Sequence, residues 1–176
     1  MLHVMIDIET LGVRPWSVIR SIGAASFNPF SSGPLEFKHE FYSNVTRSSC
    51  EEAGLVVEKR VEEWWTKQSQ AARDAVEVDQ KPLPDALDQL SRWWHQTGAK
   101  TIWCQGAAFD FPILTTAYEF LGKKPPWNFR ECRDTRTAYH VLGFDADSVG
   151  RQGTYHSALD DSKHQARCLV AAIRRE

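Results

Sequence analysis

The chain begins with a ten-residue segment, MLHVMIDIET, in which apolar residues alternate with acidic and other residues. A period of two is typical of a β-strand with one buried face. The residues expected on that buried face are Leu2, Val4, Ile6 and Ile8. Asp7 and Glu9 then share the opposite face, roughly 6 to 7 Å apart. Like charges at this separation repel by about 2 to 3 kcal/mol at an effective dielectric constant near 20.

This acidic pair has two interpretations when the strand is considered alone. Carboxylate oxygens are good ligands for a hard divalent cation such as magnesium, and a bound cation would offset the repulsion. Alternatively, one acid caps the turn at residues 10–12 and the other lies in solvent. The choice depends on whether the rest of the chain brings further acids to the same strand end.

Length and charge limit the organisation of the chain. With 176 residues it can bury roughly 70% of its unfolded surface, so we expect a single domain over residues 1–176. The net charge of −2 is nearly neutral, but residues 123–176 carry 10 basic and 7 acidic side chains. A polyanionic partner is therefore expected to contact this part. We find no signal sequence and no run of about 18 apolar residues, so we expect a cytoplasmic protein without a membrane segment.

Strand and helix patterns are interspersed along the sequence, which predicts an α/β domain. Two further strands at residues 17–27 and 35–42 would form an antiparallel meander with the first. Residues 43–54 are expected to be irregular, and the apolar spacing of residues 58–76 predicts one amphipathic helix. The later expected elements are a helix from residue 84 to 97, a strand at 101–105, a helix up to Gly122, a strand at 129–133, a helix at 136–142 and a final helix from Ser157.

Other acidic residues lie at expected helix starts. Asp110 follows a strand and opens a helix, which is where ligands bind in open α/β folds, although an acid there also favours the helix dipole. Asp134 is interpreted as a helix cap. Ser157 and Asp160 have the spacing of a capping box. Asp161, one helical turn beyond Ser157, is then left without a structural role.

The remaining candidates have a structural and a functional interpretation. His156, just before the final helix, is either a surface residue or a catalytic imidazole. For the pair Trp64 and Trp65, core packing is favoured over stacking on a nucleic-acid base. Four arginines of the basic segment either bind phosphates or are solvated, and these are Arg130, Arg133, Arg136 and Arg151.

Three segments occur in an order that resembles the DEDDh exonucleases, a branch of the ribonuclease H-like fold. They are IDIETLG, GAAFD and HSALDD. The stretches EEWWTKQSQAAR, TIWCQGAAFDFPIL and RDTRTAYHVLG are similar to phage and prophage exonucleases of the exodeoxyribonuclease VIII-like type, which are related to adenylate-specific ribonucleases. The resemblance covers nearly the whole chain. It departs at Gln105, where the wider family often has Asn.

The resemblance implies a central mixed five-stranded sheet flanked by helices, and a 3′-5′ exonuclease that releases 5′-mononucleotides from single-stranded RNA or DNA. It assigns two divalent cations, Mg²⁺ or Mn²⁺, to Asp7, Glu9, Asp110 and Asp161. Such a pair can clamp the attacking and leaving oxygens of a phosphodiester, with Asp7 as the bridging acid. His156 would be the general base, since an imidazole accepts protons near neutral pH. Thr10 and Leu11 match positions that contact the terminal nucleotide, and related nucleases are often homodimers.

Two alternatives remain from the sequence. One is a catalytically silent nucleic-acid-binding protein on the same fold, although all five acidic and histidine positions are filled. The other is a metal-dependent phosphohydrolase acting on small nucleotides. The sequence also leaves open the choice between RNA and DNA, because a contact with a 2′-hydroxyl cannot be located from residue types.

Overall fold

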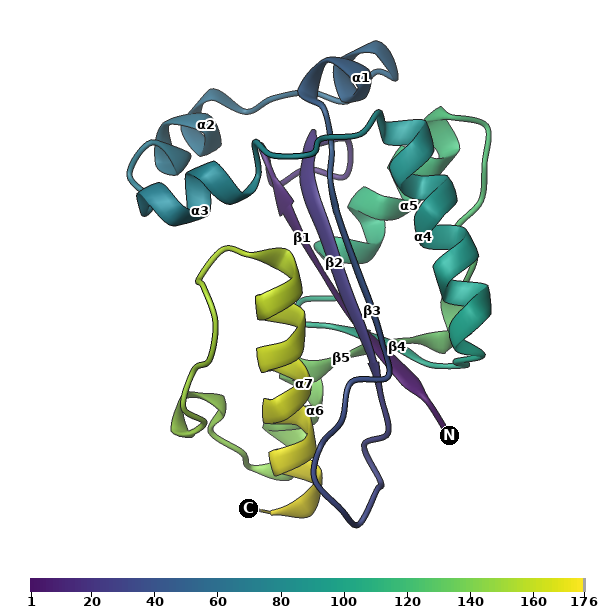
Figure 1. Cartoon of the computed structure of the whole chain (residues 1–176), viewed down its shortest axis with the longest axis vertical. Helices are drawn as coiled ribbons and strands as arrows, with labels where there is room; N and C mark the ends of the chain where they lie inside the picture. The colour runs from purple at the N-terminus through teal and green to yellow at the C-terminus, as the bar shows by residue number, and fades with distance from the viewer. Residues whose placement is uncertain (176) are drawn as a thin grey trace.

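The computed structural model describes residues 1–175, which form a five-stranded mixed sheet with the order β3-β2-β1-β4-β5 (Figure 1). The central strand β1 (His3–Thr10) is antiparallel to β2 (Ile19–Phe27) and parallel to β4 (Ile102–Cys104). The edges are β3 (His39–Asn44), antiparallel to β2, and β5 (Cys132–Asp134), parallel to β4. The expected α/β fold with a central mixed five-stranded sheet is confirmed.

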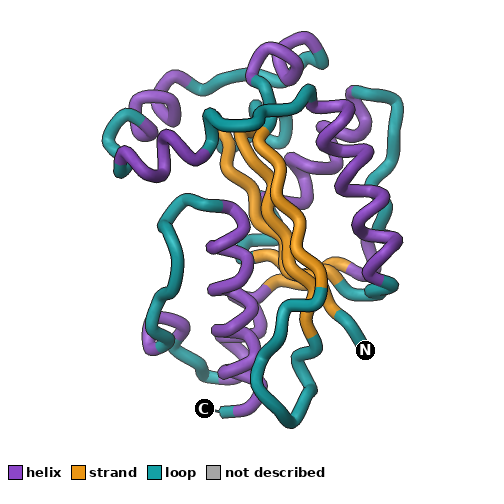
Figure 2. Tube along the Cα trace, viewed as in Figure 1, coloured by secondary structure: helices purple, strands orange, loops and turns teal. Residues whose placement is uncertain are grey.

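Helices flank the sheet on both faces (Figure 2). Helices α4 and α5 lie on one face and α6 and α7 on the other, while α1, α2 and α3 lie beyond the end at which β1 finishes (Figure 1). Their bounds are α1 Arg47–Glu52, α2 Lys59–Trp65, α3 Gln70–Ala75, α4 Leu83–Thr97, α5 Asp110–Phe120, α6 Thr135–Leu142 and α7 Ala158–Arg174. Short 3-10 turns occur at Phe129–Glu131 and Ala146–Ser148. No helix within residues 1–175 has the length and apolar character needed to cross a membrane.

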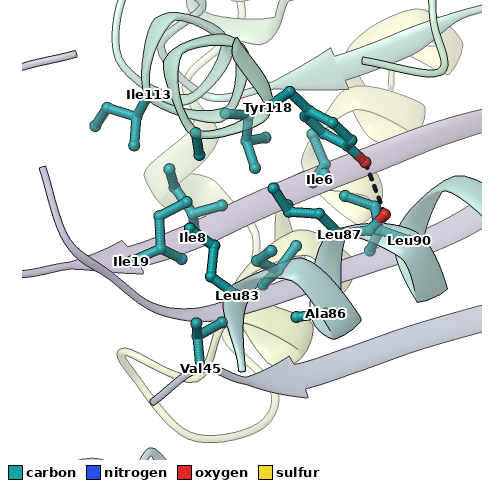
Figure 3. Packing of buried hydrophobic residues seen from close by; sticks show 14 of the residues in the cluster. Ile6, Ile8, Ile19, Val45, Leu83, Ala86, Leu87, Leu90, Ile113 and Tyr118 are labelled. Carbon is teal, nitrogen blue, oxygen red and sulfur yellow. Dashed lines mark hydrogen bonds between the residues drawn. The ribbon is translucent and has the colours of Figure 1, made fainter. Parts of the chain in front are cut away.

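Strand β1 is covered on both faces, not on one face as its alternation suggested. Ile6 and Ile8 pack with the apolar side chains of α4 and α5, where the Tyr118 hydroxyl donates to the Leu87 carbonyl at 3.0 Å (Figure 3). Met5, on the opposite face, is fully buried in a second cluster with side chains of α7. A central strand between two helical layers is buried on both faces. Solvent therefore reaches β1 mainly at its acidic end.

The prediction of a single helix at residues 58–76 is wrong, because the structure has two helices there, α2 and α3. The Thr66 hydroxyl donates to the Glu63 carbonyl at 2.7 Å, and the side-chain amide of Gln68 donates to the Trp64 carbonyl at 3.0 Å. These two bonds end α2. The Ser69 hydroxyl then accepts a bond from the Ala72 amide and caps α3. These local side-chain bonds compete with helix continuation. The stretch expected to be irregular also contains a short helix, α1.

Two strand predictions and one cap prediction need correction. The third strand begins at His39 instead of residue 35, and the strand expected at 129–133 is a 3-10 turn followed by β5. The capping box at Ser157 is absent, since the Ser157 side chain makes no cap bond. Asp160 instead accepts a hydrogen bond from the Thr154 amide at 2.8 Å. Asp160 thereby ties the preceding loop to α7.

Gly23 sets how closely α7 approaches the sheet. It lies on β2 directly opposite Asp7 of β1. A Cβ atom at Gly23 would lie 2.1 Å from the carbonyl carbon of Ala158 and 2.1 Å from the amide nitrogen of Leu159. The first turn of α7 therefore packs directly on the backbone of β2, beside Asp7.

His3 is 7% exposed, and its Nδ1 accepts a hydrogen bond from Trp103 Nε1 at 3.0 Å. Burial, helped by the N-terminal charge and Arg133, lowers the pKa of His3 to about 4. Between about pH 6.5 and pH 4 the unfolded chain therefore binds a proton that the folded chain does not. Stability should be lost as the pH falls through this range, by up to about 3 kcal/mol.

Urea unfolding of the wild type and of His3→Gln between pH 4 and 7 measures this effect. Glutamine keeps an acceptor for Trp103 but does not titrate, so the variant should lose less stability than the wild type as the pH falls. Other titrating groups are shared and cancel in the difference. Parallel stability curves for the two proteins would show that His3 does not contribute.

Candidate active site

Acids from two separate segments meet at the end of β1. Asp7 and Glu9 lie on β1, and Asp161 lies in the first turn of α7. Each of these three residues offers one carboxylate oxygen within 4.8 Å of the other two. They line a hollow of about 360 Å³, which we call the acidic hollow. Its lining residues are Asp7, Ile8, Glu9, Gln105, Phe109, Asp110, Arg136, His156, Asp161 and Gln165.

Asp110 lines the same hollow but is not part of that closest group of three. It is 3% exposed and opens α5. Gly106 has a φ of 128°, a conformation that suits glycine, and its carbonyl accepts the Phe109 and Asp110 amides at 2.7 and 3.3 Å. This turn directs the start of α5 toward β1.

Asp134 caps α6 as expected and also holds the turn that precedes Asp110. Its Oδ1 accepts a hydrogen bond from the Thr137 amide at 2.7 Å. Its Oδ2 accepts one from the Ala107 amide at 2.6 Å. The carboxylate therefore links β5 and α6 to the segment that carries Asp110.

Burial raises the pKa of each acid in the hollow, and neighbouring acids raise the pKa of Asp7 and Glu9 further. Burial raises the pKa of Glu9 to about 8, with a further rise from Asp161 and Asp110. Burial also raises the pKa of Asp110 to about 7. The pKa of Asp7 is held well above its usual range by burial and then by the charges of Asp110, Glu9 and Asp161. Buried carboxylates that repel one another favour a nearby positive charge.

The donor set fits hard divalent cations. Every candidate ligand is a carboxylate, and oxygen ligands of this kind suit Mg²⁺ and Mn²⁺. A site for zinc would instead be expected to include histidine or cysteine ligands. The hollow does contain His156, but that residue lies outside the closest group of three acids.

Arg151 and Gln165 contact two of the acids through their side chains. The Arg151 guanidinium pairs with Asp161 and also donates to the Thr154 carbonyl at 3.0 Å. Gln165 Nε2 donates to Asp7 Oδ1 at 2.7 Å. Gln165 was not among the site residues expected from the sequence. Its spacing of four residues from Asp161 on the last helix is the signal that could have found it.

The four arginines of the basic segment differ in their surroundings. Arg151 is an ion-pair partner with a side chain only 15% exposed, so it is not simply solvated. Arg136 lines the acidic hollow. Arg133 donates to the carbonyls of Arg130 and Cys132 at 2.6 and 2.8 Å. Arg130 itself lies over the ring of Phe129.

His156 lies in the loop before α7 and lines the acidic hollow. Its φ of 60° places the backbone in the left-handed region, which is uncommon for a residue with a side chain. The ring lies edge-to-face with Trp64, with centroids 4.9 Å apart, and 6.1 Å from Trp65. The imidazole is therefore held between the tryptophans of α2 and the acids.

The two tryptophans have different environments. Trp65 is 3% exposed and its Nε1 donates to the Thr10 carbonyl at 2.8 Å, which confirms a packing role. Trp64 is 42% exposed. It lines a second hollow of about 410 Å³, which we call the apolar hollow. Its lining is Ile8, Glu9, Thr10, Gly12, Val13, Arg60, Val61, Trp64, Trp65 and Phe109, so the two hollows share Ile8, Glu9 and Phe109.

Thr10 and Leu11 are separated by the structure. Thr10 lines the apolar hollow, and its hydroxyl donates to the Gly12 carbonyl at 2.6 Å. Leu11 is 5% exposed, belongs to the hydrophobic core and lines a different hollow, together with Trp65. The Leu11 side chain is thus not brought to either hollow that contains Glu9.

Comparisons with known proteins agree with this geometry. The family described as the 3′-5′ exoribonuclease Rv2179c-like domain matches residues 2–173. An exodeoxyribonuclease of Enterobacteria phage T4 is 24% identical over 166 residues, which cover 81% of this chain and 72% of the phage protein.

Solved structures share the fold at low sequence identity. The nuclease domain of 3′hExo, a DEDDh family member bound to rAMP, has a TM-score of 0.63 and 19% identity, covering 99% of this chain and 92% of that one. S. pombe Pop2p in a form with Mg²⁺ and Mn²⁺ bound has a TM-score of 0.59 and 18% identity, covering 98% and 83%. Cell-death related nuclease 4 has a TM-score of 0.71 and 12% identity, covering 99% and 64%.

The ribonuclease H-like fold and the resemblance to DEDDh nucleases are therefore confirmed. The match over residues 2–173 includes all the acids of the hollow and His156. The chain belongs to the 3′-5′ exoribonuclease Rv2179c-like family and is a 3′-5′ exonuclease.

Proposed function

We propose that this exonuclease hydrolyses the 3′-terminal phosphodiester of single-stranded RNA or DNA, releases 5′-mononucleotides and uses two divalent cations, Mg²⁺ or Mn²⁺. The observation that carries the proposal is the meeting of four carboxylates and one imidazole in the acidic hollow. The nucleotide bound to 3′hExo and the Mg²⁺ and Mn²⁺ bound to Pop2p support it.

Asp7, Glu9, Asp110 and Asp161 would hold the cations. When bound, a pair of cations supplies charge that activates the attacking water and stabilises the leaving oxygen. Asp7 is suited to the bridging position, because its carboxylate experiences the charges of all three other acids. Asp110 is fixed by the turn at Gly106 and by the Asp134 bond to Ala107.

His156 is proposed as the general base. A neutral imidazole nitrogen would take the proton of the attacking water and pass it to solvent. The contacts with Trp64 and Trp65 hold the ring at the wall of the acidic hollow.

The apolar hollow is proposed to receive the base of the terminal nucleotide. Trp64 and Phe109 offer aromatic surface there, directly beside Glu9. Stacking of a base on an aromatic side chain is tolerant of sequence, because every base has a π-face. Thr10 borders this hollow, whereas Leu11 serves packing.

Trp64→Ala should therefore raise KM for a short oligonucleotide by about 10-fold to 100-fold, since base stacking contributes roughly 1 to 3 kcal/mol per base. Trp64→Phe keeps an aromatic face and should recover most of the loss. Steady-state kinetics on a 3′-labelled strand measures both variants. An unchanged KM in Trp64→Ala would remove Trp64 from substrate binding.

A digestion panel tests the proposed substrate. It contains matched 3′-labelled single-stranded RNA, single-stranded DNA, their duplexes and a free nucleotide, each with Mn²⁺ or with a chelator. We expect stepwise release of 5′-mononucleotides from the single strands, and none with the chelator. Cleavage of the free nucleotide alone would favour a small-nucleotide phosphohydrolase. Binding of the strands without cleavage would favour a catalytically silent binding protein.

A further inference from the structure

Gln165 connects the last helix to the central strand inside the acidic hollow. It lies one turn beyond Asp161 on α7, so the two side chains point the same way. Its side chain is nearly buried, at 6% exposure. Its Nε2 donates to Asp7 Oδ1 at 2.7 Å, and its backbone carbonyl accepts the Tyr139 hydroxyl at 3.2 Å. The residue is thus anchored at the backbone while its amide reaches Asp7.

Asp161 and Asp7 are held by side chains of different charge. Asp161 pairs with the cationic guanidinium of Arg151. Asp7 receives its bond from a neutral amide. A neutral donor fixes the direction of a carboxylate without cancelling its charge. One oxygen of Asp7 is therefore held in place by a donor that adds no positive charge to the hollow.

Gln165 Oε1 is buried and accepts no hydrogen bond from the part of the chain that the structure describes. Exchanging the amide nitrogen and oxygen would place two acceptors, Oε1 and Asp7 Oδ1, against each other, so the contact with Asp7 fixes the amide orientation. A buried amide oxygen beside a polar hollow is expected to accept a bond from water in that hollow.

We propose that Gln165 is a positioning residue for Asp7, which orients this carboxylate for cation binding through a neutral hydrogen bond. The inference rests on the proposed metal centre and adds to it a residue outside the DEDDh motif segments. Groups that orient metal ligands in this way typically change metal affinity by 10-fold to 100-fold when they are removed.

The test is a Mn²⁺ titration of the full chain by calorimetry, with the thermal midpoint of the metal-free chain measured alongside. Gln165→Met keeps an unbranched side chain of similar length but neither donates nor accepts as the amide does. Its Mn²⁺ dissociation constant should rise by about 10-fold to 100-fold. Raising the Mn²⁺ concentration should recover part of its cleavage rate, which a general packing defect would not allow.

Two further variants sharpen the result. Gln96→Met makes the same chemical change at an exposed residue of α4, outside the lining of the acidic hollow, and should alter Mn²⁺ affinity less than threefold. Gln165→Lys keeps a donor but adds a positive charge. It should weaken Mn²⁺ binding more than Gln165→Met while raising the thermal midpoint of the metal-free chain.

The outcomes separate this inference from the proposed function. If the wild type binds Mn²⁺ and Gln165→Met binds it equally well, the positioning role is wrong and the metal centre stands. If Gln165→Lys binds Mn²⁺ as tightly as the wild type, the neutrality of the donor has no importance and the inference is overturned. If the wild type itself binds no Mn²⁺, the proposed metal centre fails, and the role of Gln165 fails with it.

Discussion

Replacing Asp7 with asparagine is expected to lower the rate of 3′-end cleavage by about 10³-fold or more. Asp7 lies among the other three acids and is the proposed bridging ligand, so its charge is needed for both cations. Loss of metal-dependent stabilisation of the transition state amounts to several kcal/mol, and each 1.36 kcal/mol corresponds to about tenfold in rate. Single-turnover release of nucleotides from a 3′-labelled strand, with saturating Mn²⁺, measures the change.

The same substitution should stabilise the chain when no metal is present. Asparagine keeps an oxygen that can accept the Gln165 bond, but it removes a buried carboxyl group whose charged form is disfavoured by burial and by the neighbouring acids. A gain of about 1 kcal/mol shifts the thermal midpoint of a chain of this size by roughly 2 to 4 °C. Added Mn²⁺ should raise the midpoint of the wild type but not of Asp7→Asn, because only a ligand that binds the folded state stabilises it.

Asp147→Asn is the matched control, since Asp147 is an exposed acid in the loop before α7. It should keep wild-type cleavage and the wild-type response to Mn²⁺. Wild-type cleavage by Asp7→Asn would remove the central claim of the mechanism. A lower midpoint of metal-free Asp7→Asn would instead show that the charge of Asp7 supports the fold.

The second large effect is expected for His156→Ala, in which kcat should fall by about 10²-fold to 10⁴-fold. The imidazole is proposed to move the proton of the attacking water, and it lies outside the closest group of acids. Its removal should therefore leave the Mn²⁺ dissociation constant nearly unchanged. Comparing kcat with the calorimetric affinity separates proton transfer from metal binding.

His140→Ala provides the control, because His140 is exposed in the last turn of α6. It should match the wild type in both measurements. An unchanged kcat in His156→Ala would assign the general base to another group. A large loss of Mn²⁺ affinity in that variant would make His156 a ligand instead.

Much of the site follows from short-range patterns. Asp7 and Glu9 share a strand face because side chains alternate along a strand. Asp161 lies one helical turn after Ser157, so its side chain is placed near the start of α7. Single residues do not show that Asp110 and Asp161 meet the end of β1. The order of the three motif segments along the chain predicts this meeting. This part of the site was predictable from the sequence.

Other parts depend on competition that sequence patterns do not resolve. Asp160 was expected to cap α7, but the Thr154 amide is the donor that the folded loop offers to its carboxylate. Likewise, the apolar spacing of residues 58–76 continues across two helices, because both turn an apolar side to the core although the backbone bonds break at Ser69. The contact of Gln165 with Asp7 joins residues 158 positions apart and requires the packed structure.

Gly23 has a consequence for how active and inactive relatives are distinguished. It carries no chemical group, yet the space it leaves lets α7 rest on β2 opposite Asp7. A relative could keep every acid and the histidine while a single methyl group at this position pushed the last helix away. Its motifs would be complete and its centre would be disassembled. Classifying such sequences by catalytic residues alone would then count inactive proteins as enzymes. The residue at the position of Gly23 on β2 should therefore be checked together with the motifs.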